Sequence, residues 1–317
     1  MTLPRPALDP ELAALLAQLP TAPALDAQSL PLLRQYKVPA ETYLAGRSLE
    51  RQELTISAAD GAELALSVFR PAGHDPAIAA PCIYWLHGGG MVLGDRFANL
   101  DIPLEWLERF GAVVVTLDYR LAPEATGTTP LEDCYAGLSW IAGHAAELGI
   151  DPKRIIAAGA SAGGGLTAGM VLLARDRGGP ALAAQVLICP MLDHRNDSLS
   201  SRQYCEGPAT WTQGANGFGW QALLGDGATD PVRVSPALAT DLSRLPPSFI
   251  DAGSAEVFRD EDAAYAAGIW AAGGEAELHV WPGGFHGFDA LFPAARLSII
   301  ARRTRSDWLG RILNPCN

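Results

Sequence analysis

The sequence predicts an α/β fold, in which helices cover both faces of a mostly parallel central sheet. From residue 81 onward, short and continuously apolar segments alternate with helical segments. Strands that are apolar along their whole length are typical of a parallel sheet whose two faces are both covered. Ligands of such sheets bind at the carboxyl ends of the strands. The predicted strands of this part are residues 82–86, 112–117, 155–158, 185–189, 248–252 and 276–281.

The first 45 residues are expected to form a helical extension. They carry no strand pattern, and Asp9 followed by Pro10 is typical of the start of a capped helix. A second helix is expected within residues 25–35. Because such a segment needs another surface to lie on, we interpret residues 1–45 as the N-terminal part of a cap over the sheet.

A hairpin and one long insertion complete the expected organisation. Residues 49–57 and 64–69 alternate in part and are separated by an Asp-Gly pair, which predicts two antiparallel strands. Residues 190–246 carry no clear strand and are too long for an ordinary loop, so we interpret most of them as an inserted cap. The expected domains are an N-terminal cap part (1–45), a core in two parts (46–190 and 236–317) and an inserted cap segment (191–235).

Composition and charge narrow the classes of function. The chain has 317 residues, and its formal net charge of −12 argues against nucleic acid or an anionic membrane surface as a partner. It lacks a run of 18 apolar residues and a basic N-terminus followed by an apolar run, so neither a membrane span nor a signal peptide is expected. Five scattered cysteines without a C-x-x-C pair indicate free thiols in a reducing cytoplasm. This composition suits a protein that handles neutral small molecules.

Ser161 stands at the tip of a turn between a predicted strand and a predicted helix. Residues 159–164 read G-A-S-A-G-G, and an apolar helical segment follows at 165–174. In so tight a turn the residues two before and two after the serine come close together, and a Cβ there would clash. The turn would place the hydroxyl beside the N–H of Ala162 and the helix N-terminus, where negative charge is favoured. Taken alone, the pattern also fits a close crossing of a strand and a helix.

Two glycine-rich loops follow predicted strands and offer further groups for nucleophilic catalysis. Residues 87–90 read H-G-G-G, whose N–H groups could approach a substrate oxygen closely, although a flexible turn would look the same. His286 lies in a loop directly after the last predicted strand, where a general base could reach the serine. The other histidines lie in less suitable loops, helices and strands: His74, His87, His144, His194 and His279.

The third group should be a carboxylate that lies between serine and histidine in chain order. Three candidates lie in or after the strand predicted at residues 248–252. Glu256 stands in the loop and is the favoured candidate. Asp251 lies at the edge of the strand, and Asp260 fits the first turn of the next helix, where the helix dipole favours acids. Both stay open as alternatives.

No metal or cofactor is expected. The sequence has no cluster with metal-ligand spacing and no G-x-G-x-x-G motif in a convincing context. Residues 159–164 resemble a phosphate-binding loop superficially, but the G-K-[S/T] ending is missing. A small molecule handled by side chains alone is therefore the expectation.

Four short motifs occur along the chain, and they are HGGG at 87–90, DYRLAPE at 118–124, GASAGG at 159–164 and FHGF at 285–288. In this order they resemble the hormone-sensitive-lipase-like branch of the α/β-hydrolases, also called bacterial family IV esterases. The likeness extends from about residue 45 to the end, and the set is specific although each motif is short. The resemblance implies an α/β-hydrolase fold with a helical cap made from the N-terminus and the 190–235 segment.

The resemblance also implies roles for individual residues. Ser161 would be the nucleophile and His286 the base. The N–H groups of Gly88, Gly89 and Ala162 would form the oxyanion hole. The block at 118–124 is expected to support the site structurally and receives no catalytic role.

Three positions depart from the family's usual pattern. Ala160 precedes the serine, where the family usually has aspartate or threonine. Glu256 stands where the family usually has aspartate; glutamate is one methylene longer but can still orient an imidazole. The segment 125–130 is less apolar and less proline-rich than usual, and nothing about activity follows from it.

These features predict a serine carboxylesterase that hydrolyses short-chain esters through an acyl-enzyme. The expected cap would limit acyl length, with Trp211, Phe218 and Trp220 either lining the pocket or packing in the cap's own core. Amide or lactone hydrolysis on the same triad is an alternative, and so is a non-catalytic small-molecule-binding protein on the same fold. A homodimer formed through an edge near the last strand and helix is a family-level expectation.

Overall fold

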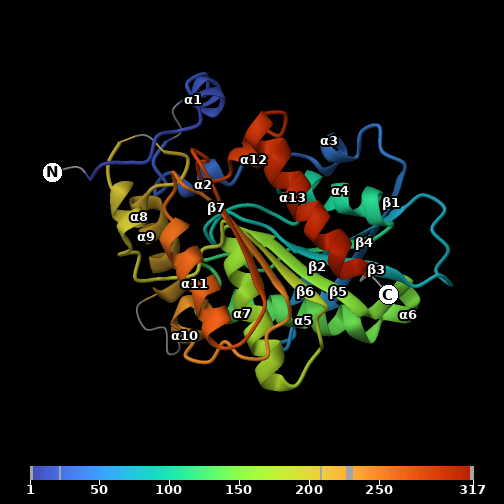
Figure 1. Ribbon diagram of the computed structural model, residues 1–317. Coiled ribbons are helices and arrows are strands. Elements are labelled where there is room, and N and C mark those ends of the chain that lie inside the picture. The colour runs from blue at the N-terminus through green and yellow to red at the C-terminus, as the bar shows by residue number, and fades with distance from the viewer. Residues whose placement is uncertain (1–2, 21–22, 208, 226–230, 315–317) are drawn as a thin grey trace.

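Eight strands form one mixed sheet at the centre of the computed structural model, which describes residues 3–20, 23–207, 209–225 and 231–314 (Figure 1). Their order across the sheet is β1-β2-β4-β3-β5-β6-β7-β8. β2 runs antiparallel to β1 and β4, and the remaining neighbours are parallel. The strands are β1 (Leu49–Ser57), β2 (Glu63–Pro71), β3 (Ala80–Leu86), β4 (Val113–Leu117), β5 (Ile150–Ala160), β6 (Ala184–Ile188), β7 (Ser248–Gly253) and β8 (Ala276–Trp281).

The fold class and all eight predicted strands are confirmed. β3, β4, β6 and β7 are buried along their whole length, which is why their sequences are continuously apolar. The hairpin between β1 and β2 closes where the Ala58 N–H donates to the Ala62 carbonyl at 2.8 Å and Asp60 accepts from the Ala62 N–H. β5 begins earlier than its apolar run because Ile150 already pairs with Ala80 of β3.

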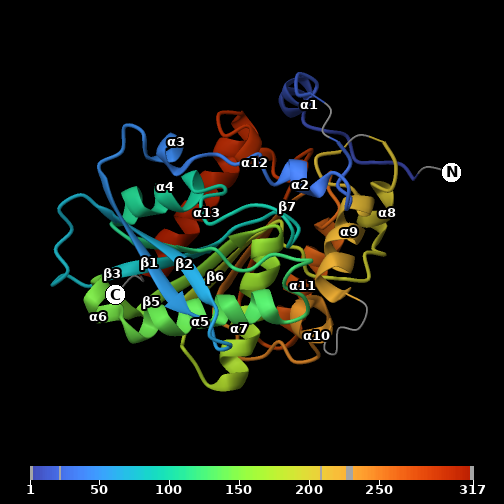
Figure 2. The same cartoon turned by 180° about the vertical axis from the view of Figure 1, so that it is seen from behind.

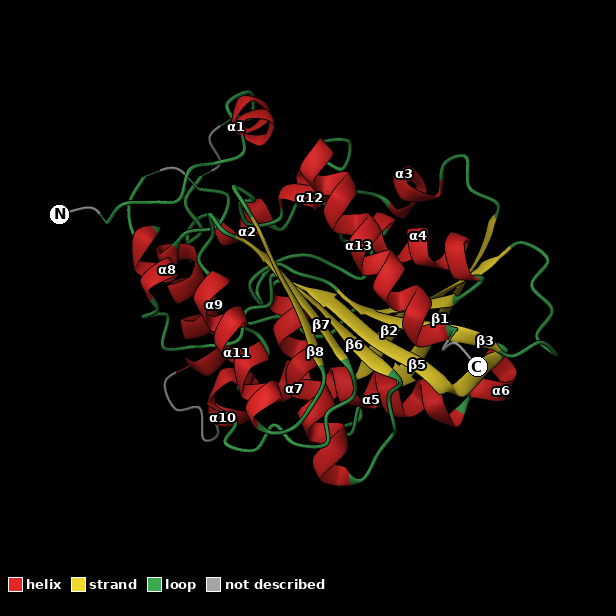
Figure 3. Cartoon of the chain, in the orientation of Figure 1, coloured by secondary structure: helices red, strands yellow, loops and turns green. Residues whose placement is uncertain are grey.

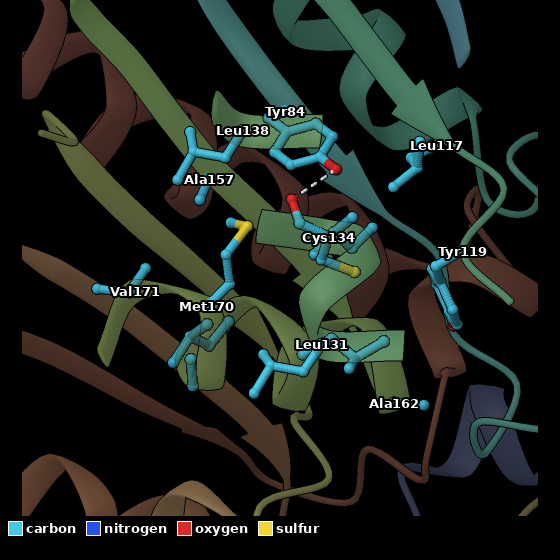
Figure 4. Packing of buried hydrophobic residues seen from close by; sticks show 14 of the residues in the cluster. Tyr84, Leu117, Tyr119, Leu131, Cys134, Leu138, Ala157, Ala162, Met170 and Val171 are labelled. Carbon is cyan, nitrogen blue, oxygen red and sulfur yellow. Dashed lines mark hydrogen bonds between the residues drawn. The ribbon is translucent and has the colours of Figure 1, made fainter. Parts of the chain in front are cut away.

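Helices cover the two faces of the sheet, as Figure 3 shows by colour. One face packs against α4 (Asp101–Phe110) and α13 (Arg296–Leu313), with Trp85 and Trp106 meeting edge to face at the centre. The other face packs against α5 (Thr129–Gly143), α7 (Ala162–Arg177) and α11 (Arg259–Ala271). Figure 4 shows part of this second core, in which the Tyr84 hydroxyl donates to the Cys134 carbonyl at 3.1 Å.

The helical segment between β4 and β5 is divided in two. α5 ends at Gly143, and the chain resumes a helical path as α6 (Ala145–Leu148). His144 has a non-helical backbone (φ −111°, ψ 16°), and its ring stacks on Trp140 while Nδ1 lies 2.9 Å from the Trp140 carbonyl. A local contact between an aromatic pair thus bends the chain at this point.

The N-terminus and the segment after β6 gather near the carboxyl ends of the parallel strands (Figures 1 and 2). Trp211 and Gly219 both lie against the backbone of Gly90, which follows β3. The described part of residues 190–246 contains no strand, as expected. Whether these segments form a separate cap with the expected boundaries stays a prediction. The short helices are α1 (Pro10–Leu16), α2 (Leu30–Leu33), α8 (Leu199–Gln203), α9 (Gln213–Leu224), α10 (Pro231–Val234), η2 (Pro236–Leu238) and α12 (Phe288–Leu291).

Not all of the N-terminal segment lies at this end. α3 (Ala40–Leu44) lies beside α4, away from α1 and α8 in both views (Figures 1 and 2). Its Tyr43 and Leu44 pack against the core on the α4 face. Among the helices that the structure describes, none is both long and apolar enough to cross a bilayer.

α1 rests on the loop that follows β8. Asp9 caps α1 as predicted, since its Oδ1 accepts from the N–H groups of Glu11 and Leu12 at 3.0 and 3.1 Å. The Asp9 N–H donates to the Gly283 carbonyl at 3.0 Å. Leu12 is completely buried in a small apolar cluster with Phe285 and its neighbours. The N-terminal segment therefore helps to fix the loop that carries His286.

We expect Leu12→Ala to lower the free energy of unfolding by about 2–4 kcal/mol, because it removes a fully buried side chain and leaves a cavity. The matched control is Leu32→Ala, since Leu32 on α2 is half exposed and should cost less than about 0.5 kcal/mol. Urea unfolding of both variants measures the difference. Equal midpoints for the two would contradict the packing of α1 on this loop.

Candidate active site

The Ser161 turn holds a backbone conformation that residues with a Cβ rarely adopt. Ser161 lies between β5 and α7 with φ 55° and ψ −122°. Its N–H donates to the carbonyl of Ile188, at the end of β6, at 2.8 Å. Its carbonyl accepts from the N–H groups of Met191 and Gly165 at 2.9 and 3.0 Å. Three backbone hydrogen bonds thus hold the strained turn against the neighbouring strand end.

The glycines of this turn are required by close backbone approach. A Cβ on Gly159 would lie 2.3 Å from the Gly163 carbonyl oxygen, and one on Gly163 would lie 2.1 Å from the Leu86 carbonyl oxygen. Both distances are far inside van der Waals contact, so neither site accepts a side chain without a backbone shift. These contacts agree with the steric clash that we inferred from the sequence for a Cβ two residues before or after Ser161.

Three side chains from distant parts of the chain meet at the tip of this turn. His286 Nε2 lies 3.0 Å from Ser161 Oγ, and His286 Nδ1 lies 2.6 Å from Glu256 Oε2. The other oxygen of Glu256, Oε1, accepts the Gly253 N–H at 2.5 Å. Glu256 is buried and His286 is nearly so. A serine, a base and a carboxylate in this geometry can carry out nucleophilic acyl transfer.

The two alternative acids have other partners. Asp251 is buried, and its Oδ2 accepts from Trp281 Nε1 at 2.7 Å and from Arg305 Nε at 2.9 Å. Asp260 accepts the Ser200 N–H at 2.8 Å and pairs with the neighbouring Arg259. Of the three candidates, Glu256 is therefore the one that contacts His286. The catalytic role of Glu256 stays a prediction.

A buried arginine joins the segments that carry Glu256 and His286. Arg305 on α13 is 1% exposed and pairs with Asp251 on β7 and with Asp289 on α12. Burial alone would raise the pKa of Asp289, but the charge and hydrogen bond of Arg305 outweigh it and hold that pKa below its usual value. For Asp251 burial outweighs Arg305, so its pKa is raised. No sequence pattern marks Arg305 as buried, because an arginine on a largely polar helix is typical of a solvent-exposed position.

Two further buried acids, Glu261 and Asp262, lie in the first turn of α11, five and six residues after Glu256. Glu261 accepts the N–H groups of Leu192 and Asp193 at 2.7 and 3.2 Å, and burial raises its pKa well above the usual value. Asp262 is completely buried, and neither of its oxygens has a hydrogen-bond partner among the described residues. Burial, followed by the charges of Glu261 and Glu256, raises the pKa of Asp262 well above its usual value. The environment of Asp262 in the folded protein therefore disfavours its charged form.

The predicted oxyanion loop lies against the serine turn. A Cβ on Gly88 would lie 3.0 Å from the Ala160 carbonyl oxygen and 3.2 Å from Ser161 Cβ, so the Gly88 backbone touches the turn. Gly89 has φ 125°, which a residue with a side chain rarely adopts. Ala162 is the first residue of α7, a position whose N–H has no acceptor within the helix. This arrangement favours the predicted donors, whose role stays a prediction.

The second motif, at residues 118–124, supports that loop from behind. The ring of Tyr119 stacks on His87 with centroids 4.2 Å apart, and its hydroxyl donates to the His87 carbonyl at 2.7 Å. Asp118 accepts from the backbone and side chain of Arg96, which leads into α4. The motif therefore has the structural place that the sequence indicated for it.

A cavity of about 240 Å³ opens beside Glu256 and His286. Trp211 lines it, with its ring centroid 6.2 Å from that of His286, and Thr210 donates to the His286 carbonyl at 2.8 Å. Trp220 instead is buried in the main core, and Phe218 packs on that core's edge. Sequence reasoning missed the N-terminal residues among the lining, which are Arg5, Pro6, Leu8 and Leu16. The other lining residues are Tyr204, Ala209, Thr210, Trp211, Ala255, Glu256, Phe285 and His286.

The sheet order, the strained serine turn and the histidine that follows β8 are together the arrangement of an α/β hydrolase. A family model described as the alpha/beta hydrolase fold matches residues 83–290. The chain therefore belongs to this family, and the likeness to its hormone-sensitive-lipase-like branch is confirmed.

Similar proteins carry esterase names. The chain is 35% identical to carboxylesterase NlhH of Mycobacterium tuberculosis in an alignment of 306 positions. This alignment covers 93% of each protein. It is 30% identical to ethyl acetate hydrolase of Pseudomonas putida, covering 89% of this chain and 92% of that protein. The solved structure of a bacterial heroin esterase superposes with a TM-score of 0.88 at 36% identity, covering 97% of this chain and 98% of that one.

We expect Asp262→Asn to stabilise the protein, and more strongly as the pH rises. Above about pH 4 the unfolded chain ionises Asp262 while the folded protein keeps its proton, so the wild type loses stability until the raised pKa is reached. Asparagine cannot ionise and avoids this loss. The gain should be about 1–3 kcal/mol at about pH 8 and smaller at about pH 5.

Denaturant unfolding at both pH values measures this gain. The control is Asp176→Asn, at an exposed helix position, which should change stability by less than about 0.5 kcal/mol at either pH. A gain for Asp262→Asn that does not grow with pH would contradict a raised pKa for this buried acid.

Proposed function

We propose that the protein is a serine carboxylesterase, which hydrolyses short-chain carboxylic esters through an acyl-enzyme intermediate. The observation that carries the proposal is the pair of contacts from His286, 3.0 Å to Ser161 and 2.6 Å to Glu256. The esterase names of relatives that align over most of this chain support the ester as the substrate class.

Each side chain has a defined task in this reaction. His286 Nε2 takes the proton of Ser161 as Oγ attacks the ester carbonyl. Glu256 accepts a hydrogen bond from the protonated Nδ1 of His286. This hydrogen bond keeps Nε2 free to act as the base and stabilises the imidazolium that forms. His286 then donates its proton to the departing alcohol. Water enters, loses a proton to His286 and releases the acid by the same route.

Backbone donors would stabilise the charge that develops on the carbonyl oxygen. We propose the N–H groups of Gly88, Gly89 and Ala162 for this task, because the loop and the first residue of α7 both border Ser161. A preset donor in such a site lowers the barrier by roughly 3 kcal/mol. Positive φ at Gly89 explains why this loop needs glycine.

The cavity beside the triad favours small esters. Its volume of about 240 Å³ is below the roughly 300–1,000 Å³ of pockets for drug-sized ligands. Its walls are mainly apolar or aromatic, with Trp211 and Phe285 near His286. We therefore propose that acetyl and similarly short esters are preferred. A relative named for ethyl acetate hydrolysis is consistent with this preference.

The homodimer and the cytoplasmic location expected from the sequence are retained as proposals. β8 is an edge strand on which Val280 is exposed, and Trp270 of the preceding helix α11 is exposed as well. Such an edge can pair with that of a second copy. Light scattering coupled to size-exclusion chromatography measures the mass, and a monomer at all concentrations would exclude the dimer.

The test of the proposed activity is hydrolysis of p-nitrophenyl esters from acetate to palmitate. We expect the rate to be highest for short chains and to fall at least about 10⁴-fold in Ser161→Ala, because the nucleophile is lost. Ser57→Ala, on the exposed side of β1, is the matched control and should keep full activity. Wild-type protein that cleaves amides or lactones but none of these esters would contradict the carboxylesterase proposal.

We expect Glu256→Gln to lower kcat by about 10³–10⁴-fold without unfolding the protein. The Gly253 N–H requires an oxygen at its side of the new amide, so the NH₂ group would face His286 Nδ1. That forces Nδ1 to accept and places the proton on Nε2, where the base is needed. Asp260→Asn is the control, and activity that survives in Glu256→Gln but is lost in the control would move the role to Asp260.

A further inference from the structure

A cysteine thiol lies next to the carboxylate and the imidazole of the candidate triad. One ligand atom from each of Cys189, Glu256 and His286 lies within 4.8 Å of the others. Cys189 and Glu256 are buried, and His286 is mostly so. Neither the proposed hydrolysis nor the packing of β6 explains why a sulfur should stand at this point.

The backbone fixes where this thiol points. Cys189 follows β6 with φ 37°, a left-handed conformation uncommon for a residue with a side chain. Its N–H donates to the Asp251 carbonyl at 2.6 Å, which ties it to β7, the strand before Glu256. The side chain is only 5% exposed and belongs to the core on the α4 face. The thiol is therefore held beside the pair instead of turning freely.

Sulfur, imidazole nitrogen and carboxylate oxygen are a ligand set that suits Zn²⁺ and its softer relative Cd²⁺. Zinc bonds of about 2.0–2.3 Å place neighbouring ligand atoms roughly 3.5 Å apart in a tetrahedral site. The three atoms need to approach by little more than an ångström to reach that spacing. A fourth position would be open to water from the cavity, because Glu256 and His286 also line it.

We propose that Cys189, Glu256 and His286 form an inhibitory site for a thiophilic divalent cation such as Zn²⁺ or Cd²⁺. The site regulates the reaction proposed above and so rests on it; the ion is an inhibitor, and the reaction itself uses no metal. Binding displaces the proton of the Cys189 thiol to solvent, while the imidazole and carboxylate lose their mutual hydrogen bond.

Either mode of imidazole binding removes the base. If the ion binds Nδ1, the ring proton must move to Nε2, which then cannot accept the proton of Ser161. If the ion binds Nε2, the lone pair itself is taken. Since one proton is released per bound ion, inhibition should strengthen as pH rises.

The test titrates the protein with CdCl₂ and follows two signals. The first is the rate of p-nitrophenyl acetate hydrolysis, relative to each variant's own rate without metal. The second is the ultraviolet charge-transfer band of a cadmium–thiolate bond, which reports binding even if the protein hydrolyses no ester. A chelator added at the end should restore the rate, since no bond to the protein is oxidised.

We expect Cys189→Ser to weaken inhibition by at least about 10-fold and to remove the thiolate band, because a hydroxyl is a poor ligand for a soft ion. Cys189→Ala is the second variant in case the buried hydroxyl disturbs folding. Cys205→Ser is the matched control, since this thiol is exposed and should not contribute. Cys316→Ser is a further control, at a position outside the described residues.

Two outcomes would overturn the proposal. One is equal inhibition of wild type and both Cys189 variants, which would place the ion on other groups. The other is a cadmium–thiolate band that disappears in Cys205→Ser or Cys316→Ser but remains in the Cys189 variants. A protein that shows the Cys189-dependent band but hydrolyses no ester would keep the metal site and contradict the proposed function, so the two failures are distinguishable.

Discussion

The hydrogen bond from the Ser161 N–H to the Ile188 carbonyl is the contact on which the site depends. It joins the end of β5 to the end of β6 and holds the serine in a conformation that would otherwise relax. The next strand end is tied in the same way, because the Cys189 N–H donates to the Asp251 carbonyl of β7. Three neighbouring strand ends are thus locked together, and the groups that they carry meet with little freedom.

The buried charged side chains near the site are of two kinds, those in ion pairs with Arg305 and an acid without a hydrogen-bond partner in the described part of the chain, Asp262. Arg305 satisfies Asp251 and Asp289 and so braces the loops on either side of Glu256 and His286. Asp262 lies nearby without any hydrogen-bond partner among the described residues, and burial raises its pKa. A buried ion pair with its partners present is tolerable, whereas an isolated buried charge is not. The Gly253 N–H and His286 each form a hydrogen bond with one oxygen of the Glu256 carboxylate.

Part of the wall of the cavity beside Glu256 and His286 comes from the N-terminal segment, which carries none of the four motifs. α1 packs on the loop after β8 through Leu12, and the residues before it reach the cavity near Trp211. The N-terminal segment therefore links two properties, the position of His286 and the size of the pocket. Changes in this segment should alter specificity without altering the chemistry of the reaction.

The sequence by itself determined the sheet, the serine turn and the loop position of His286. Apolar runs predict buried strands, and the glycines beside Ser161 predict a turn with no room for a Cβ. Both features can be predicted because each depends on a short stretch of sequence. Only the tertiary structure decided that Glu256 meets His286 while Asp251 meets Arg305, because a carboxylate's partner depends on which way each loop turns. The same holds for the break at His144, the buried Asp262, the aromatic that lines the cavity and the thiol beside the triad. Apart from the break at His144, which involves a neighbour four residues away, these features depend on residues far apart in the chain, and no local pattern records them.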